Sequence, residues 1–191
     1  MTKPQPSVHS RRLPAPSLNT HFSLRGDMTV TQTIRSPISL FVAIASALTA
    51  GIFFAFSTFV MQALGQQTAA AGIAAMQAIN ITVINPWFMV VFFGPGLIGL
   101  LLALTTFRPF NQPGALFWLA GTVLYLVGTI GVTIAGNVPL NDALAVVNPD
   151  SAAGATLWAQ YLNDWTVWNH VRTVAAAIAA VLFTLARSTA S

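Results

Sequence analysis

The sequence predicts an all-α fold, an integral membrane four-helix bundle with short interfacial helices in its two outer connections. Of the 191 residues, 55% are hydrophobic and only 6% are charged, whereas a soluble domain carries about 25% charged residues. The mean hydropathy of +0.70 agrees with a protein that lies in lipid. Four apolar runs approach the ~20 residues that a spanning helix needs, and they cover residues of about 38–61, 86–106, 116–134 and 168–186.

The chain divides into an N-terminal extension and one membrane domain. Residues 1–34 are rich in Pro, Ser and Arg and lack apolar periodicity, so we expect them to be disordered. Residues 35–187 form the predicted four-helix transmembrane domain. The arginines that flank the apolar runs fall on one side of a four-span topology: Arg25, Arg35, Arg108 and Arg187. The positive-inside rule therefore predicts two cytoplasmic termini, in a bacterial-type inner membrane.

The first outer connection, residues 62–85, has the pattern of a short helix. Ile73, Met76, Asn80 and Val83 share one helical face, which predicts a helix that lies at the interface or folds over the bundle. Asn85 before Pro86 has the pattern of an N-cap followed by proline in the first helical position. The second connection, residues 135–167, opens with NVPLN, which predicts a turn after the third run.

Small residues predict where the spans pack closely. On the first run they recur every four residues, which lets helix backbones approach one another: Ser39, Ala43, Ala47, Gly51 and Ala55. Gly121 and Gly128 play the same part on the third run. On the second run Pro95 removes a backbone donor and predicts a kink. Such a kink is either purely structural or opens a cavity in the bundle.

An aromatic stripe precedes the fourth run, with Trp158, Tyr161, Trp165 and Trp168 at spacings of three, four and three. This stripe has two interpretations. It is typical of the aromatic belt at a membrane interface, and it is also suited to line a pocket for a flat ligand. Spacing alone favours the belt.

The stretch DWTVWNHVRT, residues 164–173, places polar groups at the start of the fourth run. On a helix, Trp165, Asn169 and Arg172 share a face, whereas His170 points nearly opposite to Arg172. Asp164 lies on the same side as Arg172 and is a candidate partner for it. Ionisable groups at membrane depth favour a functional site. The structural alternative is that Arg172 extends to the lipid headgroups, with the tryptophans in the belt.

Two other classes of site are disfavoured. The chain has no cysteine and no glutamate, and His170 is the only histidine beyond the N-terminal extension, so we expect no metal site. The eight basic residues are too scattered for a nucleic-acid surface, and we expect no nucleic-acid partner.

Several segments together resemble the anthrone oxygenase-like family of small four-span membrane proteins. They occur over residues of about 40–186 in the order GIFFAFSTFVMQAL, GIAAMQAIN, NPWFMVVFFG, LYLVG, NVPLN and WTVWNHVRT. The resemblance implies a function, because fungal members oxidise polyketide anthrones to anthraquinones with O₂. It also implies no recognised cofactor, with O₂ as a co-substrate.

The residues of the polar cluster suit that chemistry. We expect His170 as the base, with Arg172 and Asn169 completing the catalytic set. Cationic and amide donors stabilise a developing oxyanion. The candidate substrate-binding residues are Asn137, Asn141, Trp165, Trp168, Asn85 and Phe88.

Two functions therefore stay open. The first is a membrane oxidoreductase that acts on a flat, anthrone- or quinol-like molecule and takes it from the lipid bilayer. The alternative is a non-catalytic membrane module that binds a lipophilic ligand or a protein partner and uses the polar layer to join its helices. A transporter ranks third, because four spans without an evident inverted repeat make a thin one unless the chain forms a homo-oligomer.

Overall fold

The computed structural model describes residues 23–106 and 113–188, and these contain helices without strands. Four helical limbs are long and apolar enough to span a membrane: Pro37–Gly65, Pro86–Thr105, Ala115–Ala145 and Ala152–Ser188. The predicted fold class is confirmed, and the protein is an integral membrane four-helix bundle. Arg108 lies outside the described residues, and the predicted orientation stays a prediction.

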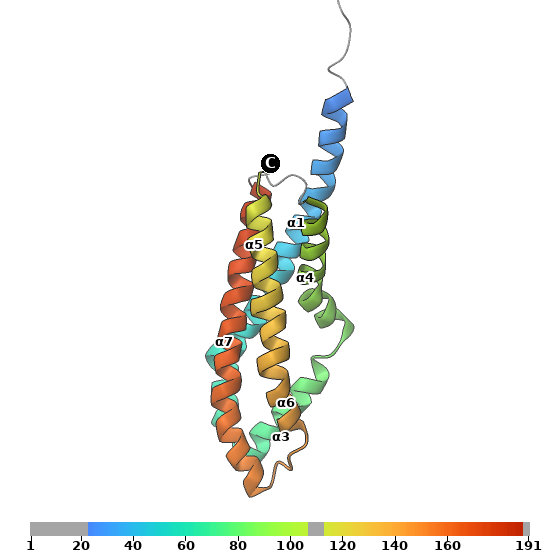
Figure 1. Ribbon diagram of the computed structural model, residues 1–191. Coiled ribbons are helices and arrows are strands. Elements are labelled where there is room, and N and C mark those ends of the chain that lie inside the picture. Colours follow the sequence, from blue (N-terminus) through green and yellow to red (C-terminus); the bar gives the residue numbers. More distant parts are fainter. Residues whose placement is uncertain (1–22, 107–112, 189–191) are drawn as a thin grey trace, which may run out of the picture.

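The limbs are made of shorter elements, and Figure 1 labels the longer helices among them. The first limb contains α1 (Ser23–Ala55), the π-helical η1 (Phe56–Val60) and α2 (Met61–Gly65). The second is α4 (Pro86–Thr106), and α3 (Ala69–Thr82) lies in the connection before it. The third contains α5 (Ala115–Leu124), the π-helical η2 (Tyr125–Gly131) and η3 (Thr133–Asn137), and α6 (Val138–Ala145). The fourth is the single helix α7 (Ala152–Ser188).

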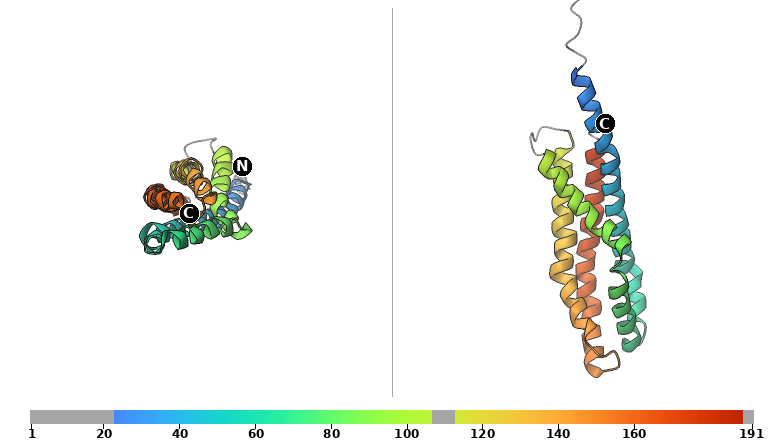
Figure 2. Two further views of the ribbon diagram at one scale, coloured as in Figure 1. Left: turned by 90° about the horizontal axis from the view of Figure 1, so that it is seen from below. Right: turned by 90° about the vertical axis from the view of Figure 1, so that its right-hand side faces the viewer.

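The limbs alternate in direction and lie side by side, as the two views of Figure 2 show. Helix α7 packs against α1 and α5, and α4 packs against the same two helices from the other side. This arrangement places the buried face of α7 along the middle of the bundle, where side chains from the first and third limbs meet it.

The bundle is taller than a membrane is thick. Helix α7 has 37 residues and is therefore about 55 Å long, against about 30 Å for the hydrocarbon core. Its N-terminal part exposes Gln160, Asn163 and Asp164, so this part lies outside the hydrocarbon. We call the projecting end the distal half, comprising α2, α3, α6 and residues 152–167 of α7.

The element boundaries differ from the predicted ones in three places. Helix α1 already begins at Ser23, so residues 23–34 are helical rather than disordered, while residues 1–22 lie outside the described residues. Extending a formed helix into flanking sequence costs little, because only nucleation is expensive. The third limb, which ends at Ala145, and α7, which begins at Ala152, are also longer than predicted.

The stretch NVPLN is helical and is not a turn. Pro139 lies near the start of α6, which follows η3 without a break, and the limb stays helical through it. Helix α7 begins at Ala152 instead of about residue 168, and Ser151 caps its start by accepting a hydrogen bond of 3.0 Å from the Gly154 N–H. The predicted second interfacial helix is thus part of the two limbs.

The first connection does contain the predicted short helix. Helix α3 buries Ile73 and Met76 completely, and both pack with the aromatic residues of α7 in the distal half. The start of α4 is also confirmed: Asn85 Oδ1 accepts a hydrogen bond of 3.0 Å from the Phe88 N–H, and Pro86 opens the helix.

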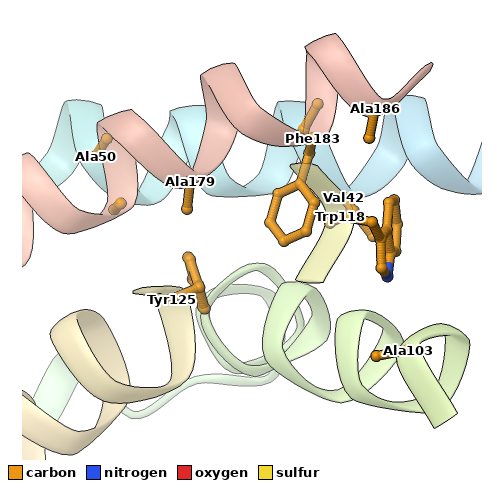
Figure 3. Close-up of a cluster of buried hydrophobic side chains, with 10 residues drawn as sticks. Val42, Ala50, Ala103, Trp118, Tyr125, Ala179, Phe183 and Ala186 are labelled. Carbon is orange, nitrogen blue, oxygen red and sulfur yellow. The ribbon is translucent and has the colours of Figure 1, made fainter. Parts of the chain in front are cut away.

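In the rest of the bundle, which we call the membrane half, an apolar cluster joins the limbs. Figure 3 shows Ala179 and Phe183 of α7 facing Tyr125 and Trp118 of the third limb. The Trp118 and Phe183 rings lie 4.9 Å apart. This cluster closes the end of the bundle at which α7 ends.

Pro95 lies inside α4, which stays helical through it. Its missing N–H frees carbonyl groups on the preceding turn, and in lipid such groups need other partners. The Thr49 hydroxyl lies 3.4 Å from the Val91 carbonyl, and the Tyr125 hydroxyl donates to the Phe92 carbonyl at 2.8 Å. Hydroxyls from two other limbs thus accommodate the proline.

Candidate functional site

Arg172 lies in the interior of the bundle and is only 4% exposed. Its Nη2 donates to Asn169 Oδ1 at 2.7 Å, and its Nη1 to Thr133 Oγ1 at 3.3 Å. The third guanidinium nitrogen, Nε, is buried without a hydrogen-bond partner. Arg172 is therefore a buried cation whose Nε–H has no partner.

Two aromatic rings enclose this guanidinium group. Its central carbon lies 4.2 Å from the centroid of the Phe53 ring and 5.0 Å from that of Trp165. Ring faces attract cations, by about 2 kcal/mol or more when the pair is desolvated. The rings hold the guanidinium plane in place without neutralising its charge.

No carboxylate balances this charge within the part of the chain whose side chains the structure describes. Asp142, Asp150 and Asp164 are all exposed. Asp164 accepts a hydrogen bond of 2.8 Å from Asn163, so the structure does not support it as the partner of Arg172. Burying an unpaired ion costs several kcal/mol, and this cost makes the site receptive to an anion.

Asn169 is fixed by contacts with the first limb. Its Nδ2 donates to the Phe53 carbonyl at 2.7 Å and to Ser57 Oγ at 2.8 Å. The Ser57 hydroxyl is in turn 3.1 Å from the hydroxyl of Thr173. These bonds fix the amide orientation, so that Asn169 Oδ1 faces Arg172.

Two further polar atoms near Arg172 lack partners. Asn137 Nδ2 donates to the Trp165 carbonyl at 3.0 Å, but Asn137 Oδ1 is buried and unpaired, as is Thr129 Oγ1. Asn137 and Thr129 lie one turn to either side of Thr133, which contacts Arg172. A buried polar atom without a partner costs about 1–3 kcal/mol. We therefore interpret these atoms as contacts for a ligand or for bound water.

The backbone is unusual at this same level. The segments η1, η2 and η3 are all π-helical, and they contain or adjoin the residues that contact Arg172 and Asn169. The π-helix is rare in proteins and occurs frequently at functional sites. Three such segments around one buried arginine favour a functional role for this layer.

The structure brings together only some of the predicted site residues. Arg172, Asn169, Asn137 and Trp165 meet in the interior, and Asn141 lies one turn beyond Asn137. Phe88 is linked to this group only through other rings. Its ring stacks on that of Phe92, with centroids 5.7 Å apart, and the Phe92 centroid lies 6.2 Å from that of Phe53.

Three predicted residues lie elsewhere. His170 is on the exposed side of α7. Trp168 is 43% exposed and contacts the third limb at Gly136, where an added Cβ would lie 2.7 Å from its ring. The Asn85 side chain caps α4.

The belt interpretation of the aromatic stripe is wrong for three of its four residues. Trp158, Tyr161 and Trp165 are each at least 95% buried, and they pack in the distal half with Met61 and Met76. Among the four residues only Trp168 is exposed as a belt residue would be.

Sequence reasoning missed the residues of the first and third limbs that complete the layer: Phe53, Ser57, Thr129 and Thr133. Each is an ordinary residue of an apolar run, and the contact of Asn169 with Phe53 is to the backbone. Among the described residues there is no cluster of three or more His, Cys, Asp or Glu that could hold a metal ion.

The exposed position of His170 leads to a testable expectation. His170→Gln should change activity by no more than about twofold, because the side chain lies on the exposed side of α7, and it should change stability by no more than about 0.5 kcal/mol. Turnover by the purified variant measures this. A loss of a hundredfold would instead support the catalytic role that the sequence predicted for His170.

Comparison with known proteins adds one finding. The family model described as anthrone oxygenase matches residues 87–182, half of the chain, from the start of α4 to the last turns of α7. The match includes Asn137, Asn169 and Arg172. No curated protein and no solved structure matches the chain.

Proposed function

The chain belongs to the anthrone oxygenase family, and on this premise we propose that it oxidises a flat, anthrone- or quinol-like molecule with O₂ inside the membrane. The observation that carries the proposal is Arg172, a buried cation with an unused donor and no carboxylate among the described side chains. Such a site suits a ligand that becomes an anion when it binds.

An anthrone can become that anion. Its methylene group is weakly acidic, and transfer of one proton to bulk water gives an enolate whose charge lies largely on oxygen. A cation within a few ångströms favours the charged form of an acid. In a buried site this attraction is stronger than in solution. Arg172 would thus lower the pKa of the bound substrate and raise the fraction present as enolate.

The enolate is electron-rich enough to react with O₂ directly. The reacting carbon forms a bond to one oxygen atom, and the resulting peroxide takes up the proton released earlier. Loss of water then breaks the O–O bond and the remaining C–H bond, leaving a carbonyl. Overall one methylene group and one O₂ give one carbonyl and one water. The scheme needs no metal or organic cofactor.

Aromatic side chains would orient the substrate. Phe53 and Trp165 lie on the guanidinium group, and the Phe88, Phe92 and Phe53 rings lie in sequence from the start of α4 towards Arg172. Because Trp87 at this end of α4 is 84% exposed, the row begins where tryptophan typically meets the membrane interface. A lipophilic substrate would reach Arg172 along these rings.

The test separates binding from catalysis. Protein in detergent, treated with a chelator, is mixed with a simple anthrone without O₂, and the absorbance of the enolate is recorded. Oxygen is then admitted and its uptake is compared with quinone formation. We expect an enolate spectrum below the pH at which free anthrone ionises, followed by uptake of one O₂ per quinone above the spontaneous rate.

The other outcomes are equally informative. An enolate spectrum without accelerated uptake would identify the non-catalytic ligand-binding alternative. Neither signal, with heat-unfolded protein as the control, would overturn the proposal for anthrone-type substrates.

A further inference from the structure

We propose that Trp158, Tyr161 and Trp165 form a chain that carries an electron hole, a missing electron, from the Arg172 site into the distal half. The three rings are stacked in order along α7. The Trp158 and Tyr161 centroids are 5.6 Å apart with an interplanar angle of 17°, and the Tyr161 and Trp165 centroids are 6.1 Å apart with an angle of 22°.

The identity of these residues supports the proposal. Tryptophan and tyrosine are among the side chains that lose an electron most readily, and here they alternate in contact. All three are buried, so water does not intervene between the rings. The chain starts at the site itself, because the Trp165 ring lies 5.0 Å from the guanidinium carbon of Arg172.

Charge gives the chain a direction. An oxidised tryptophan carries a positive charge, which the neighbouring Arg172 repels. This repulsion is strongest at Trp165, the ring that contacts Arg172, and weaker at Tyr161 and Trp158, which lie farther along α7. A hole formed on Trp165 therefore moves away from the site.

Asn141 links the two residues nearest the site. Its Oδ1 accepts hydrogen bonds of 2.8 Å from both the Tyr161 hydroxyl and the Trp165 Nε1. Tyrosine loses its phenolic proton when it is oxidised, and that proton needs a route to water. Asn141 is only half-buried, so the hydrogen bond of Tyr161 leads towards the outside of the bundle.

The source of the hole rests on the proposed function. When O₂ takes one electron from the enolate, superoxide and a substrate radical form beside Trp165. If superoxide escapes without coupling, the substrate radical adds a second O₂ and becomes a peroxyl radical. One electron from Trp165 and one proton reduce this peroxyl radical to a hydroperoxide. Tyr161 then gives an electron to Trp165 and its proton to water. A thiol reductant in solution returns one electron through Trp158, and one proton from water restores the hydroxyl of Tyr161.

The chain can be tested without substrate. The protein in detergent is oxidised by flash photolysis with ruthenium tris-bipyridine and persulfate, and the radical is trapped by freezing for EPR. The chain has two tyrosines, and both are buried, but Tyr125 lies in the apolar cluster of the membrane half. Tyr125→Phe is therefore the matched control for Tyr161→Phe.

We expect a tyrosyl radical that Tyr161→Phe removes and Tyr125→Phe leaves intact, with most of the signal lost in Trp158→Phe. Thermal unfolding verifies that each variant is folded. A tyrosyl signal that survives in Tyr161→Phe, or no tyrosyl signal in the wild type, would overturn the proposal.

A second measurement concerns the role of the chain during turnover. With anthrone and O₂, Tyr161→Phe should accumulate oxygen addition on Trp165, detected by peptide mass mapping, more than the wild type does. If the wild type shows no turnover, the proposed function fails, while the EPR result still decides whether the chain conducts. If turnover is normal and Trp165 stays unmodified, the protective role is wrong.

Discussion

Replacing Arg172 by methionine is expected to lower activity by about 100- to 1,000-fold, the usual effect of removing a donor that stabilises a developing oxyanion. Stability should respond differently. Methionine keeps most of the side-chain volume but removes a buried charge that has no carboxylate partner among the described residues. Activity and stability should therefore separate in this variant.

Two opposing effects determine the stability of Arg172→Met. The variant leaves Asn169 Oδ1 and Thr133 Oγ1 without their donor. An unpaired buried acceptor costs about 1–3 kcal/mol, although the Thr133 hydroxyl keeps its bond to the Thr129 carbonyl at 2.7 Å. The removed desolvation cost of the charge is several kcal/mol. We expect the melting temperature to stay the same or to rise.

The measurements are turnover with anthrone and thermal unfolding in the same detergent. Arg187→Met is the matched control, because Arg187 is exposed at the end of α7. Arg172→Lys keeps a charge but loses the fork of donors, and it should restore little activity. If Arg172→Met were inactive and also unfolded, the arginine would have a structural role, and the main support for an anion site would be lost.

The sequence predicted the membrane fold well because hydrophobicity adds up along a run. Each span needs about 20 apolar residues, and four such runs leave few alternatives. It predicted the distal half poorly. Residues 152–167 of α7 are aromatic on one face and polar on the other, so no apolar run marks them as helix. The lipid belt interpretation failed at Trp158 because this ring packs against α3 and is not exposed to lipid.

Only the part of the site that lies on α7 could be predicted from the sequence. Helical geometry placed Trp165, Asn169 and Arg172 on one face and His170 on another, and the structure agrees. The partners from other limbs are set by tertiary packing, which no local pattern encodes. Asn169 donates to the backbone carbonyl of Phe53. Because every residue has a backbone carbonyl, the sequence does not show which one accepts this bond.

The small-residue stripe of the first run shows the same limit. Ser39 and Ala43 are buried, whereas Ala47 and Gly51 are exposed. At 3.6 residues per turn, a four-residue spacing drifts by about 40° per step, or about 160° over four steps. A stripe with this spacing therefore winds away from its partner. By contrast, the predicted close contacts at Gly121 and Gly128 are present.

Gly128→Ala should accordingly destabilise the bundle. An added Cβ at this position would lie 2.6 Å from the Cβ of Ala175 on α7, far inside van der Waals contact. Neither group can move without its helix. Overpacking of this kind costs about 1–3 kcal/mol, against a gain in helix propensity of about 1 kcal/mol. We expect a net loss of stability, measured as a lower melting temperature in detergent.

A second substitution tests the cause of that loss. Ala175→Gly removes the opposing Cβ, so the double variant Gly128→Ala with Ala175→Gly exchanges the two groups across the same contact. Its stability should return close to that of the wild type, which two independent losses would not produce. Gly51→Ala is the matched control, because no atom lies within 4 Å of its added Cβ, and it should be neutral or slightly stabilising. If the double variant were less stable than Gly128→Ala alone, the close approach of α7 to the third limb would not be the cause.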